Sequence, residues 1–120
     1  MRKESATPFN MEESLMNLGG DKEIFKEIAE MFFDESRELM EQLSQAIGNV
    51  DSQSIMKTAH AIKGMVGNFA AHSTFATAYR LEKMGREHNL ENAPAVFVLL
   101  ESQVKELQDA LSAALHKFSI

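Results

Sequence analysis

The stretch FVLLESQVKELQDALSAALHKF, residues 97–118, decides the fold of this 120-residue chain. Apolar residues recur in it at spacings of three and four, which is the period of one face of an α-helix. Such a stripe is more often the core of a helix bundle than a cofactor-binding surface. A coiled-coil dimer is the alternative, but the repeat lasts only about three heptads and the rest of the chain needs it internally. The stripe consists of Phe97, Leu100, Val104, Leu107, Leu111, Ala114 and Phe118.

Similar stripes earlier in the chain, together with residues that start and stop helices, predict four more helices. Asp21, Asp51 and Asn92 are placed to cap the second, third and fifth of them. The expected ranges, caps included, are residues 10–18, 21–47, 51 to a turn at 71–73, 74–88, and 92 onward. Four long helices with short connections predict an all-α fold, an antiparallel up-down four-helix bundle with a short additional N-terminal helix.

The length and composition of the chain exclude several kinds of site and partner. We expect residues 1–9 to be a disordered tail and residues 10–120 to form one domain, which is long enough to bury a core. The absence of cysteine excludes disulfides and thiolate metal sites. A net charge of −6, with both signs interspersed, argues against a nucleic-acid partner. No apolar run is long enough to be a secretory signal or a membrane span, so we expect a cytoplasmic location. We also expect the chain to be a monomer.

The third predicted helix contains AHAIKG, residues 59–64. At about 100° per residue, His60 points roughly 140° away from the mean direction of that helix's apolar stripe, so it should face solvent. Lys63, Gly64 and Gly67 share its side of the helix. The stripe itself is Ile55, Ala59, Ile62, Val66 and Phe69.

The two glycines distinguish this histidine from an ordinary surface residue. A single histidine on a helix is usually just solvated. Each glycine in a helix interior costs about 1 kcal/mol relative to alanine, so a purely structural surface would gain by replacing Gly64 and Gly67. Glycine on this side predicts that the backbone of another protein approaches closely.

Three segments of the chain carry a family resemblance: residues 60–64 (HAIKG), residues 67–71 (GNFAA) and the pair Leu81-Glu82. Together they resemble the signature of histidine-containing phosphotransfer (HPt) domains, and the resemblance extends over nearly the whole chain. Two departures are visible, Ile62 where leucine is commoner and Ala70 where glycine is usual. Neither touches the chemistry.

The resemblance implies that His60 is a phosphoacceptor and that Lys63 supplies positive charge to the phosphoryl group. A neutral imidazole is a good nucleophile toward phosphorus, and phosphoryl transfer needs positive charge near the equatorial oxygens. The chain has no glycine-rich phosphate loop, no Walker lysine motif and no evident carboxylate set for magnesium. We therefore expect a phosphoryl carrier without kinase activity and without a cofactor, whose magnesium lies on the partner.

Glu82 and Arg86 lie one turn apart on the fourth predicted helix, whose inward face we place at Phe75, Ala78 and Gly85. Glu82 then falls at the rim of that face. The resemblance implies that Glu82 accepts a hydrogen bond from the imidazole, leaving Nε2 as the nucleophile. The alternative is an ordinary surface pair between Glu82 and Arg86. Arg86 is also a weaker candidate as a charge partner for the phosphoryl group.

The partners implied by the resemblance are receiver domains of response regulators, and a hybrid sensor histidine kinase is a further candidate. Their expected docking surface combines the first helix, the start of the second and the histidine helix. For Leu15 and Ile28, packing between the first two helices is an equally good interpretation. The candidate docking residues are Met11, Leu15, Ile24, Ile28, Ala61, Gly64 and Met65.

Other functions remain open at this point. The chain could be the N-terminal domain of a chemotaxis-type kinase, although its initial methionine and lack of a long linker favour a free-standing relay protein. A helical adaptor without catalytic function would leave the glycines unexplained. A metal site is disfavoured, because no two of the histidines in the chain are four residues apart. These histidines are His60, His72, His88 and His116.

Overall fold

The computed structural model describes residues 8–118, and within them it contains five helices and no strand. The all-α prediction and the short first helix are therefore confirmed. None of the helices in this part of the chain is long and apolar enough to cross a membrane. The helices are α1 (Met11–Asn17), α2 (Lys22–Gly48), α3 (Ser52–Gly67), α4 (His72–Glu87) and α5 (Ala93–Phe118).

Side-chain caps fix the starts of the first three helices, and those at Asp21 and Asp51 are as the sequence predicts. Asn10 accepts a hydrogen bond from the backbone N–H of Glu13, and Asp21 caps α2 in the same way. Asp51 accepts bonds from both the hydroxyl and the backbone N–H of Ser54. These bonds lower the pKa of Asp51, because they favour its charged form.

The start of α4 differs from the prediction. This helix begins at His72, two residues before the expected Thr74, and the turn falls on residues 68–70 instead of 71–73. Ala70 makes the turn by adopting a left-handed conformation, with φ of 53°. Alanine rarely takes such a conformation, so its side chain gives little warning of it.

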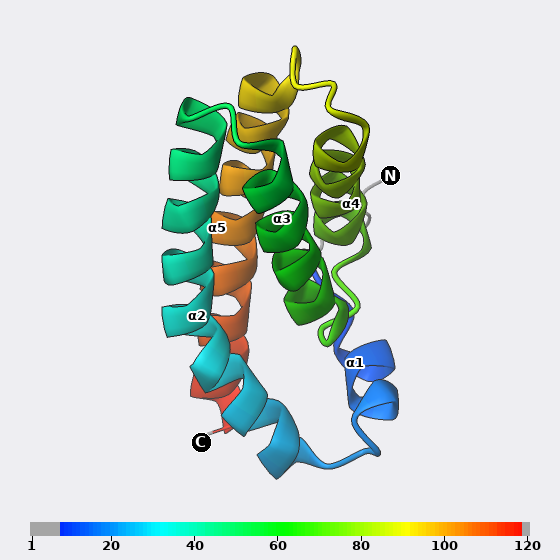
Figure 1. Cartoon of the computed structure of the whole chain (residues 1–120). Helices are drawn as coiled ribbons and strands as arrows, with labels where there is room; N and C mark the ends of the chain where they lie inside the picture. Colours follow the sequence, from blue (N-terminus) through cyan, green and yellow to red (C-terminus); the bar gives the residue numbers. More distant parts are fainter. Residues whose placement is uncertain (1–7, 119–120) are drawn as a thin grey trace, which may run out of the picture.

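The four long helices lie alongside one another, and α1 lies near the end of α3 that leads into α4 (Figure 1). α2 packs against α3 and α5, and α4 packs against the same two helices. The core between them includes Phe25, Phe32 and Phe69, whose rings meet edge to face at centroid distances of 5.8 and 5.4 Å. Every residue of the predicted α3 stripe is buried.

The tail prediction needs one correction. Residues 1–7 lie outside the described part of the chain, but Phe9 belongs to the packed domain. Its ring stacks on Phe25 at 6.2 Å, and the next residue, Asn10, donates a backbone hydrogen bond to the Phe69 carbonyl. Burial of an aromatic ring therefore extends the ordered domain to position 9.

Gly85 lets α3 and α4 pack closely, and these two helices share the most extensive contact of any helix pair. A Cβ atom on Gly85 would lie 2.6 Å from the Ser52 carbonyl oxygen and 2.7 Å from the Met56 backbone nitrogen. Both are backbone atoms and cannot move aside easily. The close approach brings side chains of α4 within reach of the exposed face of α3.

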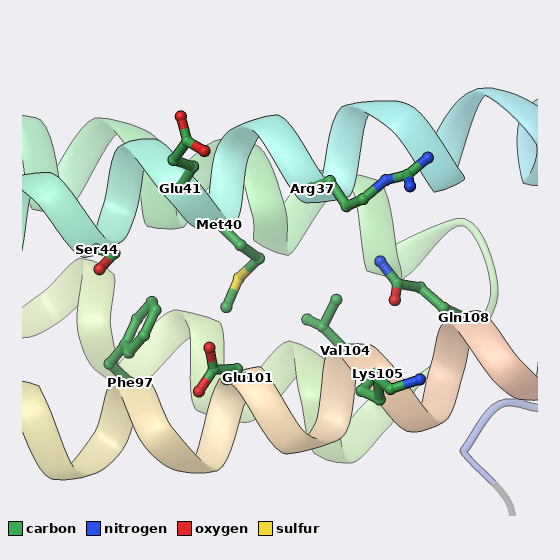
Figure 2. Close-up of a pocket in the computed structure, with 9 residues that line it drawn as sticks. All are labelled: Arg37, Met40, Glu41, Ser44, Phe97, Glu101, Val104, Lys105 and Gln108. Carbon is green, nitrogen blue, oxygen red and sulfur yellow. The ribbon is translucent and has the colours of Figure 1, made fainter.

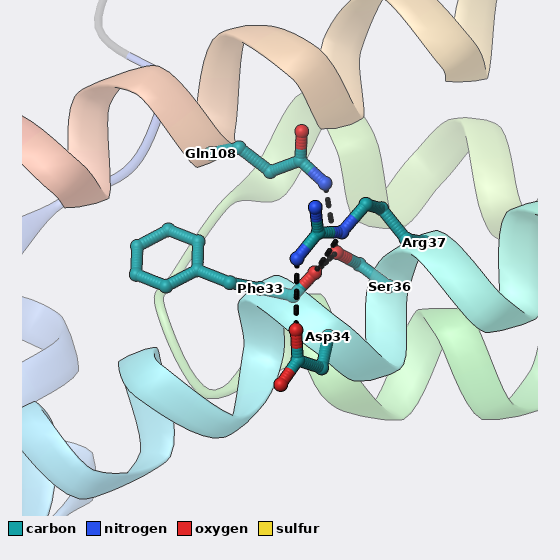
Figure 3. A network of polar contacts seen from close by, with 5 residues as sticks. All are labelled: Phe33, Asp34, Ser36, Arg37 and Gln108. Atoms are coloured by element: carbon teal, nitrogen blue, oxygen red, sulfur yellow. Dashed lines mark hydrogen bonds and ion pairs between the residues drawn. The ribbon is translucent and has the colours of Figure 1, made fainter.

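On the side of the molecule where α2 meets α5, a small polar network includes one hydrogen bond between the two helices (Figure 3). Gln108 donates through Nε2 to the Ser36 hydroxyl at 2.9 Å. Arg37 donates to the Phe33 carbonyl and pairs with Asp34 at 2.8 Å. The bond from Gln108 to Ser36 joins α5 to α2, whereas the contacts of Arg37 lie within α2.

Candidate functional site

His60 lies on the outer face of α3, as the helical periodicity predicts. Its side chain is 67% exposed, whereas its neighbour Ala59 is completely buried. The imidazole is not free to rotate, however, because Nδ1 lies 2.9 Å from Oε2 of Glu82 on α4. The structure thus brings together two residues that the sequence places 22 positions apart.

Glu82 lies at the centre of a cluster of ionisable side chains that includes His60. Its side chain is 6% exposed, so it is buried and not at the rim where the sequence placed it. Among the described residues, three basic side chains meet its carboxylate. In addition to His60, Lys63 Nζ lies 2.7 Å from Oε1, and Arg86 donates to Oε2 at 3.0 Å. The imidazole contact and the surface pair with Arg86, considered above as alternatives, therefore occur together.

Burial is the largest single influence on the Glu82 carboxyl group and by itself would raise its pKa. The contacts with Lys63 and His60 and their positive charge outweigh it, so the pKa of Glu82 lies below its ordinary value. The carboxylate is then ionised at neutral pH and can only accept hydrogen bonds. In the neutral form of the His60 ring, therefore, Nδ1 carries the proton and Nε2 has a free lone pair.

Lys63 is held more firmly than an ordinary surface lysine. Its side chain is only 19% exposed, and its ammonium lies 5.2 Å from the ring centroid of Tyr79 and 5.8 Å from that of Phe75. The prediction that Phe75 belongs to the inward face of α4 is wrong, because this residue is 40% exposed. Sequence reasoning missed Tyr79, although residues 75, 79, 82 and 86 are spaced to lie on one face of a helix.

The two glycines of the predicted approach surface differ in their surroundings. A side chain added at Gly64 would meet open space. A Cβ on Gly67 would lie 3.6 Å from the Phe75 ring, so that ring already covers its outer side. Gly64 has the open surroundings that close approach by another backbone requires, and Gly67 does not.

The predicted docking residues fall into two groups. Ile24, Ala61 and Gly64 are exposed, with Ile24 at 41%. The other four are half-buried and pack against the core, which supports the alternative interpretation for two of them. Met16 and Met31, which the sequence analysis did not single out, are 75% and 56% exposed. The half-buried residues are Met11, Leu15, Ile28 and Met65.

A second histidine, His72 at the start of α4, also contacts a carboxylate. Its Nε2 lies 2.9 Å from Oε1 of Glu13 on α1, and both side chains are exposed, at 71% and 45%. The described residues contain no group of three or more histidine or acidic side chains that could hold a metal ion.

A groove of about 380 Å³ runs between α2 and α5, and its lining does not include His60 (Figure 2). Its floor is apolar, with Met40, Phe97 and Val104 between the two helices. Glu41 and Glu101 lie toward one end of the groove and Arg37 toward the other (Figure 2). The nine lining residues include no histidine, so the groove contains no imidazole like that of His60.

Comparison with known proteins gives a family match and a similar solved structure. The family model described as "Hpt domain" matches residues 27–116. A search of curated proteins gave no match. The fold is similar to the crystal structure of histidine-containing phosphotransfer protein B (HptB) from Pseudomonas aeruginosa PAO1, with a TM-score of 0.85. The two chains are 20% identical, and the alignment covers 93% of this chain and 97% of the other.

Proposed function

The chain belongs to the Hpt domain family and is a histidine phosphotransfer protein of phosphorelay signalling, and we propose that His60 is its phosphoacceptor. In this proposal His60 takes the phosphoryl group from the aspartyl phosphate of one receiver domain and passes it to another. The observation that carries the proposal is the contact between the buried Glu82 carboxylate and His60 Nδ1. It leaves Nε2 exposed and unprotonated on the neutral ring.

In the forward step the Nε2 lone pair of His60 attacks the phosphorus atom in line. The bond between phosphorus and the receiver's aspartate oxygen breaks, and that aspartate leaves as a carboxylate. The new N–P bond leaves positive charge on the ring, which still carries its proton on Nδ1. The Glu82 carboxylate, 2.9 Å from Nδ1, stabilises that charge. The reverse sequence at a second receiver releases the group.

Lys63 supplies positive charge to the phosphoryl oxygens. Its ammonium rests on Glu82 Oε1 in this structure, and its flexible four-carbon stem allows it to turn toward a phosphoryl group on the neighbouring turn of α3. Arg86 neutralises Glu82 from the other side, so the carboxylate keeps a cationic partner when Lys63 turns away. We assign Arg86 this supporting role.

The proposal also covers the partners of the chain, its cofactor requirement, its location and the arrangement of its helices. Hpt domains are phosphocarrier modules and not kinases, and we assign the chain no kinase activity and no cofactor of its own. Magnesium belongs to the receiver domain, whose aspartate it activates. The partners are receiver domains and a hybrid sensor kinase. The chain acts as a cytoplasmic monomer whose four long helices form an antiparallel up-down bundle.

Incubation with a receiver domain carrying a labelled aspartyl phosphate tests the proposal. The chain should acquire a label that survives base and is lost in acid, as a phosphoramidate should be. His60→Gln should acquire none. His72→Gln is the matched control, because His72 is equally exposed and also contacts a carboxylate, and it should be labelled normally. Label on His60→Gln would show that another residue is the nucleophile.

A further inference from the structure

Two aromatic rings beside Lys63 have no part in the chemistry described so far. Tyr79 and Phe75 belong to α4, but they are 44% and 40% exposed, unlike the buried Ala78 and Leu81 of the same helix. The Lys63 ammonium lies 5.2 Å from the centroid of the Tyr79 ring and 5.8 Å from that of Phe75. At such distances the negative face of an aromatic ring attracts a cation.

The rings and Glu82 together enclose the lysine. Glu82 follows Tyr79 by three residues and so lies on the next turn of the same face of α4. The carboxylate contacts the ammonium at 2.7 Å, and the side chain of Lys63 is reduced to 19% exposure. Phe75 in turn is seated against α3 at Gly67, where a side chain would otherwise begin. The enclosure is therefore built from both helices.

An unrestrained lysine would serve phosphoryl transfer poorly. Its four-carbon stem has many rotamers, and its ammonium is strongly hydrated, so on an open surface the charge would spend much of its time away from His60. A carboxylate alone would hold the ammonium by charge, but it would also compete for the ammonium's hydrogen-bonding protons. The aromatic faces attract it without competing for its hydrogen-bonding protons, so these remain available to a phosphoryl oxygen.

We propose that Tyr79, assisted by Phe75, is a positioning residue that holds the Lys63 ammonium beside His60. This inference rests on the proposed function, because Lys63 acts on the phosphoryl group that His60 accepts. The ring works through the lysine and not by touching the receiver. Removal of the ring should therefore lower the rate of transfer within the complex and leave the affinity for the receiver unchanged.

Single-turnover transfer from a phosphorylated receiver, measured over a range of receiver concentrations, separates these two quantities. Tyr79→Ala should lower the maximal rate roughly two- to fivefold, the effect of one partly exposed cation–π contact. The half-saturating receiver concentration should stay the same. Tyr79→Phe keeps the aromatic face and should transfer at the wild-type rate. Tyr79→Leu keeps apolar bulk without that face, and should be as slow as Tyr79→Ala with a normal thermal midpoint.

The decisive arm repeats Tyr79→Ala in a Lys63→Met background, which has no ammonium to hold. In that background, Tyr79→Ala should leave the transfer rate unchanged. An equal loss in both backgrounds, or a raised half-saturating concentration, would mean that the ring contacts the receiver and would overturn the inference. A wild-type rate for Tyr79→Ala would overturn it as well. A wild-type chain that takes no label at all counts against the proposed function itself, so the two failures are distinguishable.

Discussion

His60 and His72 are two histidine–carboxylate pairs in one small domain, and they differ in what surrounds the carboxylate. Both imidazoles are exposed, at 67% and 71%, and both lie 2.9 Å from a glutamate oxygen. Glu82 is buried and contacts His60 through Nδ1, whereas Glu13 is 45% exposed and contacts His72 through Nε2. In the His60 pair, the outward nitrogen Nε2 is left free on the neutral ring. In the His72 pair, Nε2 is the atom that contacts the carboxylate.

The positions that follow each histidine extend the contrast. Three and four residues after His60 come Lys63 and Gly64, a cation and an open space. Three and four residues after His72 come Phe75 and Ala76. Under the proposed function, a histidine beside a carboxylate is therefore not enough to make a phosphotransfer site. The proposal also requires a buried carboxylate, a nearby cation and room for a partner.

The largest effect we predict comes from Gly85→Ala, which separates the helices that form the His60 pair. A methyl group at this position would lie within 3 Å of the α3 backbone, and overpacking of this kind costs about 3 kcal/mol. Urea unfolding measures the loss, and the transfer rate should fall with it. Gly64→Ala is the control in open space and should raise stability by up to about 1 kcal/mol. Equal stability of the two variants would contradict the close packing.

Lys63→Ala should slow transfer by about ten- to a hundredfold, because one charge-assisted contact to the phosphoryl group contributes roughly 1.5–3 kcal/mol. Lys57→Ala removes an exposed lysine from the same helix and should leave the rate unchanged. Arginine at position 63 should restore the rate only in part, because its planar fork differs from a compact ammonium. Single-turnover rates test all three variants, and equal rates for Lys63→Ala and Lys57→Ala would remove Lys63 from the mechanism.

Glu82→Gln should lower the free energy of unfolding at pH 7 by about 1–2 kcal/mol, since it leaves the surrounding basic groups without their shared anion. The pKa of Glu82 is lowered in the folded state, so its stabilisation is present above the ordinary value of 4.5. It is lost as the pH falls through the lower folded value. The difference between wild type and variant should therefore shrink in acid.

Glu13→Gln supplies the matched control for that experiment. Its pair with His72 is exposed, so its removal should cost less than about 1 kcal/mol at pH 7. Denaturant unfolding of both variants between pH 7 and pH 3 tests the contrast. A difference for Glu82→Gln that stays constant over this range would show that the carboxylate contributes nothing through its charge.

The smallest change in stability is expected for Gly64→Gln. Helix propensity improves and the site is open, so the variant should be as stable as wild type or slightly more stable. Transfer should nevertheless slow, because the new side chain stands where the receiver approaches. Ala76→Gln places the same side chain four residues after His72 and should transfer normally. An unchanged rate for Gly64→Gln would end the close-approach interpretation of this glycine.

The sequence predicted those features that depend on local periodicity. The stripe of α3 and the caps at Asp21 and Asp51 need only spacing and side-chain chemistry, and the structure has them where expected. The outward direction of His60 follows from the same arithmetic. Within one helix, a side chain's direction is fixed to within a fraction of a turn.

The parts that the sequence missed depend on how two helices meet. Gly85 brings α4 against the backbone of α3, and this contact buries Glu82 and leaves Phe75 at the edge. A helical wheel gives the direction of a side chain but not the distance to the neighbouring helix. The cation–π contact of Tyr79 was missed for the same reason.

The central claim is that Glu82 holds His60 Nδ1 so that Nε2 receives the phosphoryl group. Heteronuclear NMR on the phosphorylated chain, with nitrogen-15 in its histidine rings, tests it directly. The account predicts that phosphorus couples to Nε2 of His60 and that Nδ1 of the same ring keeps its proton. Coupling to Nδ1 of His60, or to a ring nitrogen of His72, His88 or His116, would contradict it.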